Sequence, residues 1–140
     1  MTAVLEKTLY TGRTRTSGGR DGNGVSSDGW LKLRLSPPGS GRPGTNPEQL
    51  LGVGWSACFI GAMRRAGQAL AIRVPEDVAV AAEISLGNTH DGGFALAARL
   101  TVELPGLEAE DKTRLVEAAH QLCPYSKATR GNIEVTFDIP

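Results

Sequence analysis

Apolar and polar residues alternate along three segments of the chain, which is the pattern of strands that bury one face. In Trp30–Leu35 every second residue is a leucine, and the residues between the leucines are basic. Phe94–Leu104 and Ile133–Ile139 show a similar alternation, and Val78–Leu86 is a further apolar segment of strand length. A turn of glycine, histidine and aspartate residues separates this further segment from Phe94. The pattern therefore predicts an early strand, a pair of adjacent strands and a closing strand.

A long apolar segment between these strands has the features of a buried helix. Asn46 suits the N-cap and Pro47 the first helical position, and a carboxylate and a glutamine complete the first turn. Apolar residues then continue on all sides to Ala66, so we expect the helix to be buried on most faces. Three glycines within it predict close packing against another backbone: Gly52, Gly54 and Gly61.

A second helix is predicted over Glu108–Cys123. Acidic residues open this segment, apolar residues recur at helical spacing, and Pro124 ends it. The segment Pro37–Gly44 is rich in proline and glycine and is predicted as a loop within the domain. The whole chain, residues 1–140, is therefore expected to form one α+β domain with mainly antiparallel strands around a long buried central helix.

Composition narrows the possible partners and the compartment. The 140 residues carry 15 Lys and Arg against 15 Asp and Glu, so no net field attracts nucleic acid or an anionic membrane. The longest uncharged stretch, Leu50–Met63, has 14 residues, whereas a membrane span needs about 20. The N-terminus lacks the apolar segment and cleavage site of a secretory signal. We expect a cytoplasmic protein that binds neither nucleic acid nor membrane.

Two further motifs carry little weight. Gly52–Ala57 has the spacing of a dinucleotide-binding fingerprint, but that fingerprint must join a strand to a helix and this segment lies inside the predicted helix. His90, His120 and the two cysteines lack the short spacings typical of a metal site. We therefore expect neither an organic cofactor nor a metal.

The two cysteines are the strongest candidates for chemistry. Cys58 lies in the middle of the apolar helix, where it is either an inert buried thiol or a nucleophile. Cys123 lies in the last turn of the second helix, where the negative end of the helix dipole disfavours a thiolate. If the pair reacts, Cys58 attacks and Cys123 forms a disulfide with it.

A thiolate in apolar surroundings needs a cation, because burial raises the pKa of a thiol. Arg20 lies in a glycine-rich turn, Gly18–Gly22, that we expect to be flexible; it is either an exposed turn residue or a cation that reaches a site. Glu48, in the first turn of the long helix, either complements the helix dipole or holds an arginine in a bidentate pair.

The chain resembles the organic hydroperoxide resistance family, which belongs to the OsmC-like superfamily. The resemblance extends over essentially the whole chain and is carried by four segments in the family's order: Gly18–Gly22, Thr45–Leu50, Ser56–Phe59 and Cys123–Asn132. It implies an OsmC-like fold and an intertwined homodimer. It also implies a cytoplasmic thiol peroxidase that reduces alkyl and fatty-acid hydroperoxides to alcohols without a cofactor.

The resemblance assigns a role to each candidate residue. Cys58 would be the thiol that attacks the peroxide, Cys123 its disulfide partner, Arg20 the activating cation and Glu48 the residue that orients Arg20. The disulfide would be reduced by dihydrolipoyl groups on lipoylated proteins. The alternative is a non-enzymatic binder of an apolar ligand whose cysteines belong only to the core.

The implied roles also bear on assembly. Ten residues of one predicted helix separate Glu48 from Cys58, which places their backbones about 15 Å apart. If Glu48 and Arg20 serve Cys58, the simplest arrangement is a two-fold dimer. Each site would then take its cysteines from one chain and Arg20 and Glu48 from the other.

Overall fold

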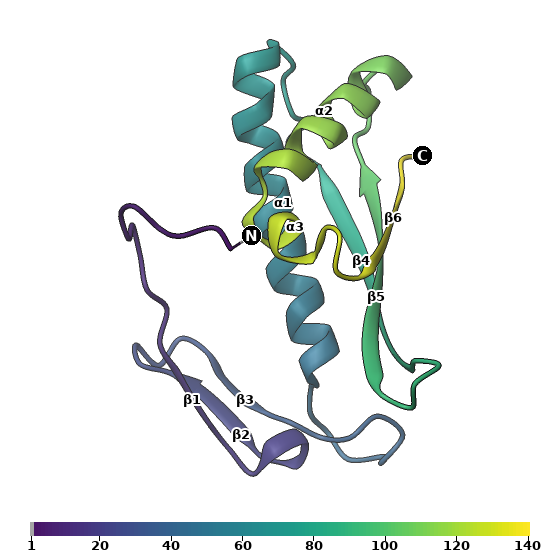
Figure 1. Ribbon diagram of the computed structural model, residues 1–140. Coiled ribbons are helices and arrows are strands. Elements are labelled where there is room, and N and C mark those ends of the chain that lie inside the picture. Colours follow the sequence, from purple (N-terminus) through teal and green to yellow (C-terminus); the bar gives the residue numbers. More distant parts are fainter. Residues whose placement is uncertain (1) are drawn as a thin grey trace. The chain divides into compact units, whose positions relative to one another are not determined.

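The computed structural model describes residues 2–140, which form an α+β structure with two three-stranded sheets (Figure 1). The chain divides into two compact units, the first ending at Pro47 and the second running from Glu48 to Pro140. The predicted α+β class is confirmed, and the described strand pairs are mainly antiparallel, as expected. That the whole chain behaves as one domain stays a prediction.

The first unit contains a small antiparallel sheet in the order β1-β2-β3. Its strands are β1 (Thr14–Ser17), β2 (Asn23–Ser26) and β3 (Lys32–Arg34). The predicted strand Trp30–Leu35 is thus shortened to β3, and the backbone of Leu35 instead pairs with Thr45. The first two strands were not predicted, because all of β1 and half of β2 are exposed and no apolar alternation marks them.

The second unit begins with the long helix α1 (Pro47–Leu70). Its start at Pro47 confirms the prediction from the Asn-Pro sequence, and it continues one turn beyond Ala66. After the helix the chain reverses through Ala71, at a φ of 56°, and the N–H of Ile72 donates to the Gly67 carbonyl at 2.9 Å. A Cβ at Gly67 would lie 2.3 Å from the Ile72 carbonyl oxygen, so this reversal requires glycine there.

The second sheet has the order β4-β5-β6. The predicted pair of strands is confirmed as β4 (Ala79–Asn88) and β5 (Phe94–Glu103), which pair antiparallel along their whole length. The closing strand β6 (Glu134–Asp138) also forms, but it runs parallel to β5. A parallel partner requires a long crossover, and two helices provide it.

These crossover helices are α2 (Ala109–Leu122) and α3 (Pro124–Thr129). Pro124 ends α2 as predicted, but it also occupies the first turn of α3, which was not predicted. Proline is favoured at a first helical position because the N–H that it lacks would have no helical partner there. Cys123 lies between the two helices with an extended backbone.

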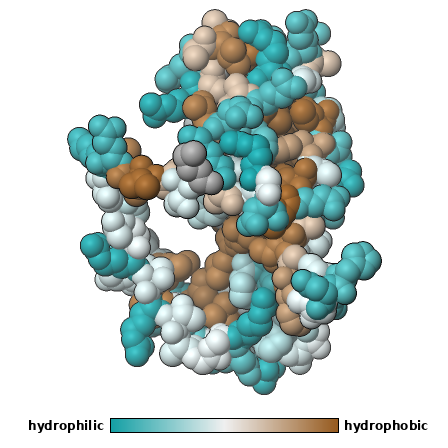
Figure 2. Space-filling model, in the orientation of Figure 1, coloured by the Kyte–Doolittle hydropathy of each residue, from teal (hydrophilic) through white to brown (hydrophobic). Residues whose placement is uncertain are grey.

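A single apolar core fills the second unit between α1, α2 and one face of the β4-β5-β6 sheet. Its largest fully buried side chains are Trp55, Phe59, Met63, Leu100, Leu104 and Leu115. In the single chain α1 buries Trp55, Phe59 and Met63 completely, whereas Val53 is 71% exposed. Apolar surface is visible between polar regions of the molecule (Figure 2).

The glycines of α1 only partly fulfil their predicted role. A Cβ at Gly52 would meet Ala82 and Ile84 of β4 at 3.6 Å, so this glycine lies close to the sheet. A Cβ at Gly54 would meet the Tyr125 phenol at 3.0 Å, a side chain and not a backbone. Gly61 has open space on its exposed side, with nothing within 4 Å of a Cβ among the described residues.

Candidate active site

The two cysteines lie side by side in the second unit. Cys58 is in the middle of α1 and Cys123 is between α2 and α3, and their sulfur atoms are 3.6 Å apart. The Cys123 thiol donates a hydrogen bond to the Cys58 sulfur, and both cysteines are free thiols. Cys123 is fully buried, whereas Cys58 is partly exposed. An external reactant can therefore approach the pair from the Cys58 side.

Backbone hydrogen bonds hold Cys123 on both sides. Its N–H donates to the Ala119 carbonyl at 2.8 Å, as the last such bond of α2. Its own carbonyl accepts from the N–H of Lys127 at 2.9 Å and so belongs to α3. The extended residue between two helix ends directs its thiol at α1, and a change in the angle between α2 and α3 would move that thiol.

The surroundings favour the neutral form of Cys58. Burial raises the pKa of the Cys58 thiol, and the neighbouring Cys123 thiol raises it further. The backbone N–H of Tyr125, in the first turn of α3, lowers the pKa by less than these two effects raise it. A reactive thiolate at Cys58 consequently requires additional positive charge.

A buried hydrogen bond lies one helical turn from each cysteine. The indole N–H of Trp55 donates to the Ser126 hydroxyl at 3.3 Å, and both side chains are fully buried. The sequence analysis missed Ser126. The available signal was the tryptophan at position 55 within the predicted buried helix, because a buried indole N–H needs an acceptor.

Phe59, which follows Cys58 on α1, belongs to an aromatic cluster. Phe59 packs against Phe137 of β6 with ring centroids 5.4 Å apart, and His120 of α2 contacts Phe137 edge-on at 4.9 Å. Burial and the Arg130 charge lower the pKa of His120. Its Nδ1 atom has no hydrogen-bond partner among residues 2–140. His120 therefore acts here as a neutral, largely apolar packing group.

Arg20 belongs to the first unit, where it lies in a short 3₁₀ turn between β1 and β2. The turn is tight, and its backbone requires glycine at two positions. Gly18 has a φ of 77°, in the left-handed region that favours glycine. A Cβ at Gly22 would lie 1.7 Å from the Ser17 carbonyl oxygen. The exposed Arg20 lies between these two glycines, and the flexibility of the turn stays a prediction.

Glu48 lies in the first turn of α1 and is half-buried. It shares this uninterrupted helix with Cys58, ten residues further along. A rise of 1.5 Å per residue separates the two backbones by about 15 Å. The helix therefore does not bring the carboxylate of Glu48 to the thiol of the same chain.

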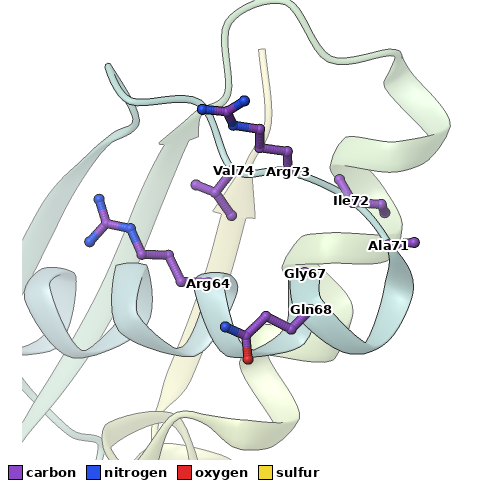
Figure 3. A pocket seen from close by; sticks show the side chains of 7 residues that line it. All are labelled: Arg64, Gly67, Gln68, Ala71, Ile72, Arg73 and Val74. Atoms are coloured by element: carbon purple, nitrogen blue, oxygen red, sulfur yellow. The ribbon is translucent and has the colours of Figure 1, made fainter.

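A hollow of about 500 Å³ lies at the other end of α1, and neither cysteine lines it (Figure 3). Arg64 and Gln68 reach it from the helix, and Arg73 and Val74 from the segment that follows. Within residues 2–140, no group of three or more His, Cys, Asp and Glu side chains is arranged to hold a metal ion.

No helix in the described part of the chain is both long and apolar enough to cross a membrane.

Residues 38–138 match the OsmC-like protein family. The organic hydroperoxide resistance protein of Xanthomonas axonopodis pv. citri is 44% identical to the chain, over 98% of this chain and 99% of that protein. The crystal structure of the organic hydroperoxide resistance protein OhrB of Bacillus subtilis is similar with a TM-score of 0.89 and 39% identity, over 95% of this chain and 100% of that one.

The chain is also similar to the crystal structure of a putative organic hydroperoxide resistance protein from Vibrio cholerae, which has captopril bound in one of its active sites. The TM-score is 0.87 and the sequence identity is 38%. The alignment covers 96% of this chain and 94% of that one. Both structural similarities therefore extend over nearly the whole chain.

Proposed function

The chain belongs to the OsmC-like protein family, and from this premise we propose that it is a thiol peroxidase that reduces organic hydroperoxides to alcohols. The observation that carries the proposal is the pair of free thiols 3.6 Å apart, one fully buried and the other open to an external reactant. Relatives named organic hydroperoxide resistance proteins supply the substrate class.

The first step takes place at the partly exposed thiol. The Cys58 thiolate attacks the distal oxygen of the hydroperoxide, and the O–O bond breaks. Sulfur keeps the distal oxygen as a sulfenic acid, and the other oxygen leaves as an alkoxide that takes a proton to become the alcohol. Cys58 is oxidised and the hydroperoxide is reduced by two electrons.

The second step uses the buried neighbour. The Cys123 thiol attacks the sulfur of the Cys58 sulfenic acid, the S–O bond breaks, and water leaves with the thiol proton. The sulfur atoms start 3.6 Å apart and a disulfide needs about 2.05 Å. An approach of about 1.5 Å is small enough for a shift of one helix end.

Activation of Cys58 is assigned to Arg20, held by Glu48. The second unit raises the pKa of Cys58, so a cation from outside its immediate surroundings is needed to form the thiolate. A guanidinium can stabilise the thiolate and polarise the peroxide, while a carboxylate fixes its plane through a bidentate pair. The exposed position of Arg20 in a short 3₁₀ turn supports such a role.

The proposed active form of the protein is an intertwined homodimer. Glu48 is too far along α1 to serve Cys58 of the same chain, so the partner chain would supply Arg20 and Glu48. One face of α1 supports this arrangement, since small or apolar residues four positions apart are exposed there: Val53, Ala57 and Gly61. Such a face permits two helices to approach closely.

Recycling of the disulfide is assigned to a dihydrolipoyl group on a lipoylated protein. Two thiols of the reductant replace the Cys58–Cys123 disulfide and close a disulfide of their own, so that electrons balance without a bound cofactor. The Vibrio cholerae relative binds captopril, which is itself a thiol, in an active site. A cytoplasmic location suits this cycle, because thiols are kept reduced there.

The preference for organic peroxides is assigned to apolar surface near Cys58. Phe59 and Met63 are fully buried and cannot line a path for substrate. Leu122 and Tyr125, which flank Cys123 and Pro124 in sequence, are 42% and 39% exposed and can contact an alkyl tail. Each methylene buried against them contributes about 0.8 kcal/mol.

Thiol titration tests the function directly. One equivalent of cumene hydroperoxide should remove both thiols of each chain and yield one equivalent of cumyl alcohol. Dihydrolipoamide should then restore both thiols more effectively than thioredoxin does. A binder of apolar ligands with core cysteines would retain both thiols and release no alcohol, and that result would reject the proposal.

A further inference from the structure

The Trp55–Ser126 hydrogen bond and the cysteine pair join the same two segments of backbone. Trp55 precedes Cys58 by three residues on α1, and Ser126 follows Cys123 by three residues in α3. The two contacts are therefore one helical turn apart on each side. The indole N–H reaches the hydroxyl at 3.3 Å, and the two sulfur atoms are 3.6 Å apart.

Burial makes this hydrogen bond difficult to break. Both partners are fully buried, so water cannot replace Ser126 as the acceptor for the indole. A buried donor without a partner loses its hydration and gains nothing in return. Movement of α3 away from α1 consequently leaves the Trp55 N–H unsatisfied, and the first turn of α3 is held at a fixed distance from α1.

The first turn of α3 and the residue before it carry two of the groups that act on the Cys58 sulfur. Cys123 directly precedes α3, and its carbonyl accepts a hydrogen bond from the N–H of Lys127, so Cys123 moves with α3. Tyr125 is the second residue of α3, and its backbone N–H lowers the pKa of Cys58. Ser126 is the next residue, so the link to Trp55 acts on the segment that carries both groups.

We propose that the Trp55–Ser126 hydrogen bond is a positioning device for disulfide closure, which keeps the Cys123 thiol against the sulfur that it attacks. The inference rests on the proposed peroxidase function and assigns no contact with substrate to either residue. It concerns one step: the Cys123 sulfur bonds to the Cys58 sulfur, the S–O bond of the sulfenic acid breaks, and water leaves. No additional oxidant or reductant enters this step.

The test separates the two steps of oxidation in Ser126→Ala. Rapid mixing with cumene hydroperoxide, quenching with dimedone and mass spectrometry measure both the formation of the Cys58 sulfenic acid and its loss to the disulfide. Because misplacement of reacting groups by about 1 Å can cost up to a hundredfold, we expect closure to slow by about tenfold or more. Alcohol release in the first turnover should change far less.

Companion variants separate positioning from general loss of stability. Ser126→Thr keeps a hydroxyl and should close faster than Ser126→Ala. Trp55→Phe removes the donor and should slow closure as Ser126→Ala does, with little further loss in the double variant. Leu104→Ala removes a fully buried side chain at the end of β5, before α2 begins, and should destabilise the fold without slowing closure.

The outcomes are distinct. Slow closure in Ser126→Ala and Trp55→Phe, non-additive in the double variant and absent in Leu104→Ala, supports the inference. Closure at the natural rate in Ser126→Ala, or equal slowing in Leu104→Ala, overturns it while the peroxidase function stands. If the natural chain itself forms neither sulfenic acid nor disulfide, the proposed function fails first and the inference fails with it.

Discussion

The two units of the chain differ sharply in how they bury apolar side chains. The second unit has a continuous core in which Trp55, Phe59 and Leu100 are fully buried. In the described part of the first unit, Leu35 is the single apolar residue of the buried core. Trp30 and Tyr10 of that unit are 92% and 82% exposed.

This difference explains why the proposed chemistry is divided between the units. The packed unit holds two sulfur atoms in contact but raises the pKa of Cys58, so packing alone does not make a nucleophile. The open unit presents Arg20 on a closed turn and leaves large apolar side chains exposed. In the proposed dimer, Arg20 of the partner chain would supply the positive charge that Cys58 requires.

The largest expected effect comes from the packed unit. Cys58→Ser should abolish peroxide reduction, because no other described thiol is accessible to the substrate. Cys123→Ser should release about one alcohol per chain and then stop, since the sulfenic acid forms but no disulfide follows. Alcohol release measured by chromatography and mass spectrometry of Cys58 distinguish the two variants. An unmodified Cys58 in peroxide-treated Cys123→Ser protein would contradict the assignment.

Mixing inactive chains tests whether the two units act across a dimer. Cys58→Ser chains keep Arg20, and Arg20→Ala chains keep both cysteines. If each site combines residues from two chains, the mixed dimer should contain one complete site and recover activity in proportion to its abundance. Subunit exchange is checked by native mass spectrometry. Verified exchange without any recovered activity would place each complete site within one chain.

Loss of the cation should have a smaller effect than loss of the thiol. Arg20→Ala should slow reaction with cumene hydroperoxide by roughly a hundredfold, the cost typical of removing one group that stabilises developing charge. It should also shift the pH dependence upward, because the pKa of Cys58 would rise and thiolate would form only at higher pH.

A matched control accompanies this measurement. Arg99→Ala removes an exposed arginine that pairs with Asp138 on the sheet, and it should leave both the rate and its pH dependence unchanged. If the Arg20→Ala protein keeps the natural rate and pH dependence, Arg20 is an exposed turn residue that does not activate Cys58.

Stability should reproduce the contrast in packing. Leu100→Ala, in the core of the second unit, should lower the free energy of unfolding by about 2–5 kcal/mol. Val25→Ala, at a position 42% exposed in the first unit, should cost less than about 1 kcal/mol. Urea unfolding measures both values. A loss at Val25 as large as that at Leu100 would show that a surface outside the single chain covers it.

The smallest effect concerns pH and His120. Burial and Arg130 lower its pKa in the folded chain below the ordinary value of 6.5. The unfolded chain therefore takes up the proton first, and stability should fall as the pH drops below 6.5. His120→Gln should weaken this dependence between pH 7.5 and 5, measured by urea unfolding, whereas His90→Gln in the exposed β4–β5 turn should not. Equal pH slopes in all three proteins would contradict this account.

The sequence predicted the elements whose side chains alternate or carry a clear terminus. Pro47 marked the start of α1, and the apolar alternation located β5 and β6. It missed β1, because all its residues are exposed and its pairing depends only on backbone hydrogen bonds. It also missed α3, because proline both ends one helix and suits the first turn of the next, and the short segment after Pro124 shows no apolar periodicity.

The candidate site was predictable in part for related reasons. Helix positions and the family resemblance both selected Cys58 and Cys123, and the two sulfur atoms do meet. Their contact could not follow from local pattern, since it depends on the crossover that returns α3 to α1. The same applies to Ser126, whose buried partner is 71 positions away. The parts taken by Arg20 and Glu48 stay predictions.

The unequal exposure of the two thiols also decides where chemical damage accumulates. Peroxide in excess reaches Cys58, so any oxidation beyond sulfenic acid begins there. Cys123 is fully buried and is therefore screened from peroxide, from glutathione and from alkylating compounds in the reduced chain. In the proposed cycle, the working lifetime of each molecule would depend on two competing reactions of the Cys58 sulfenic acid: attack by the neighbouring Cys123 thiol and oxidation by a second peroxide.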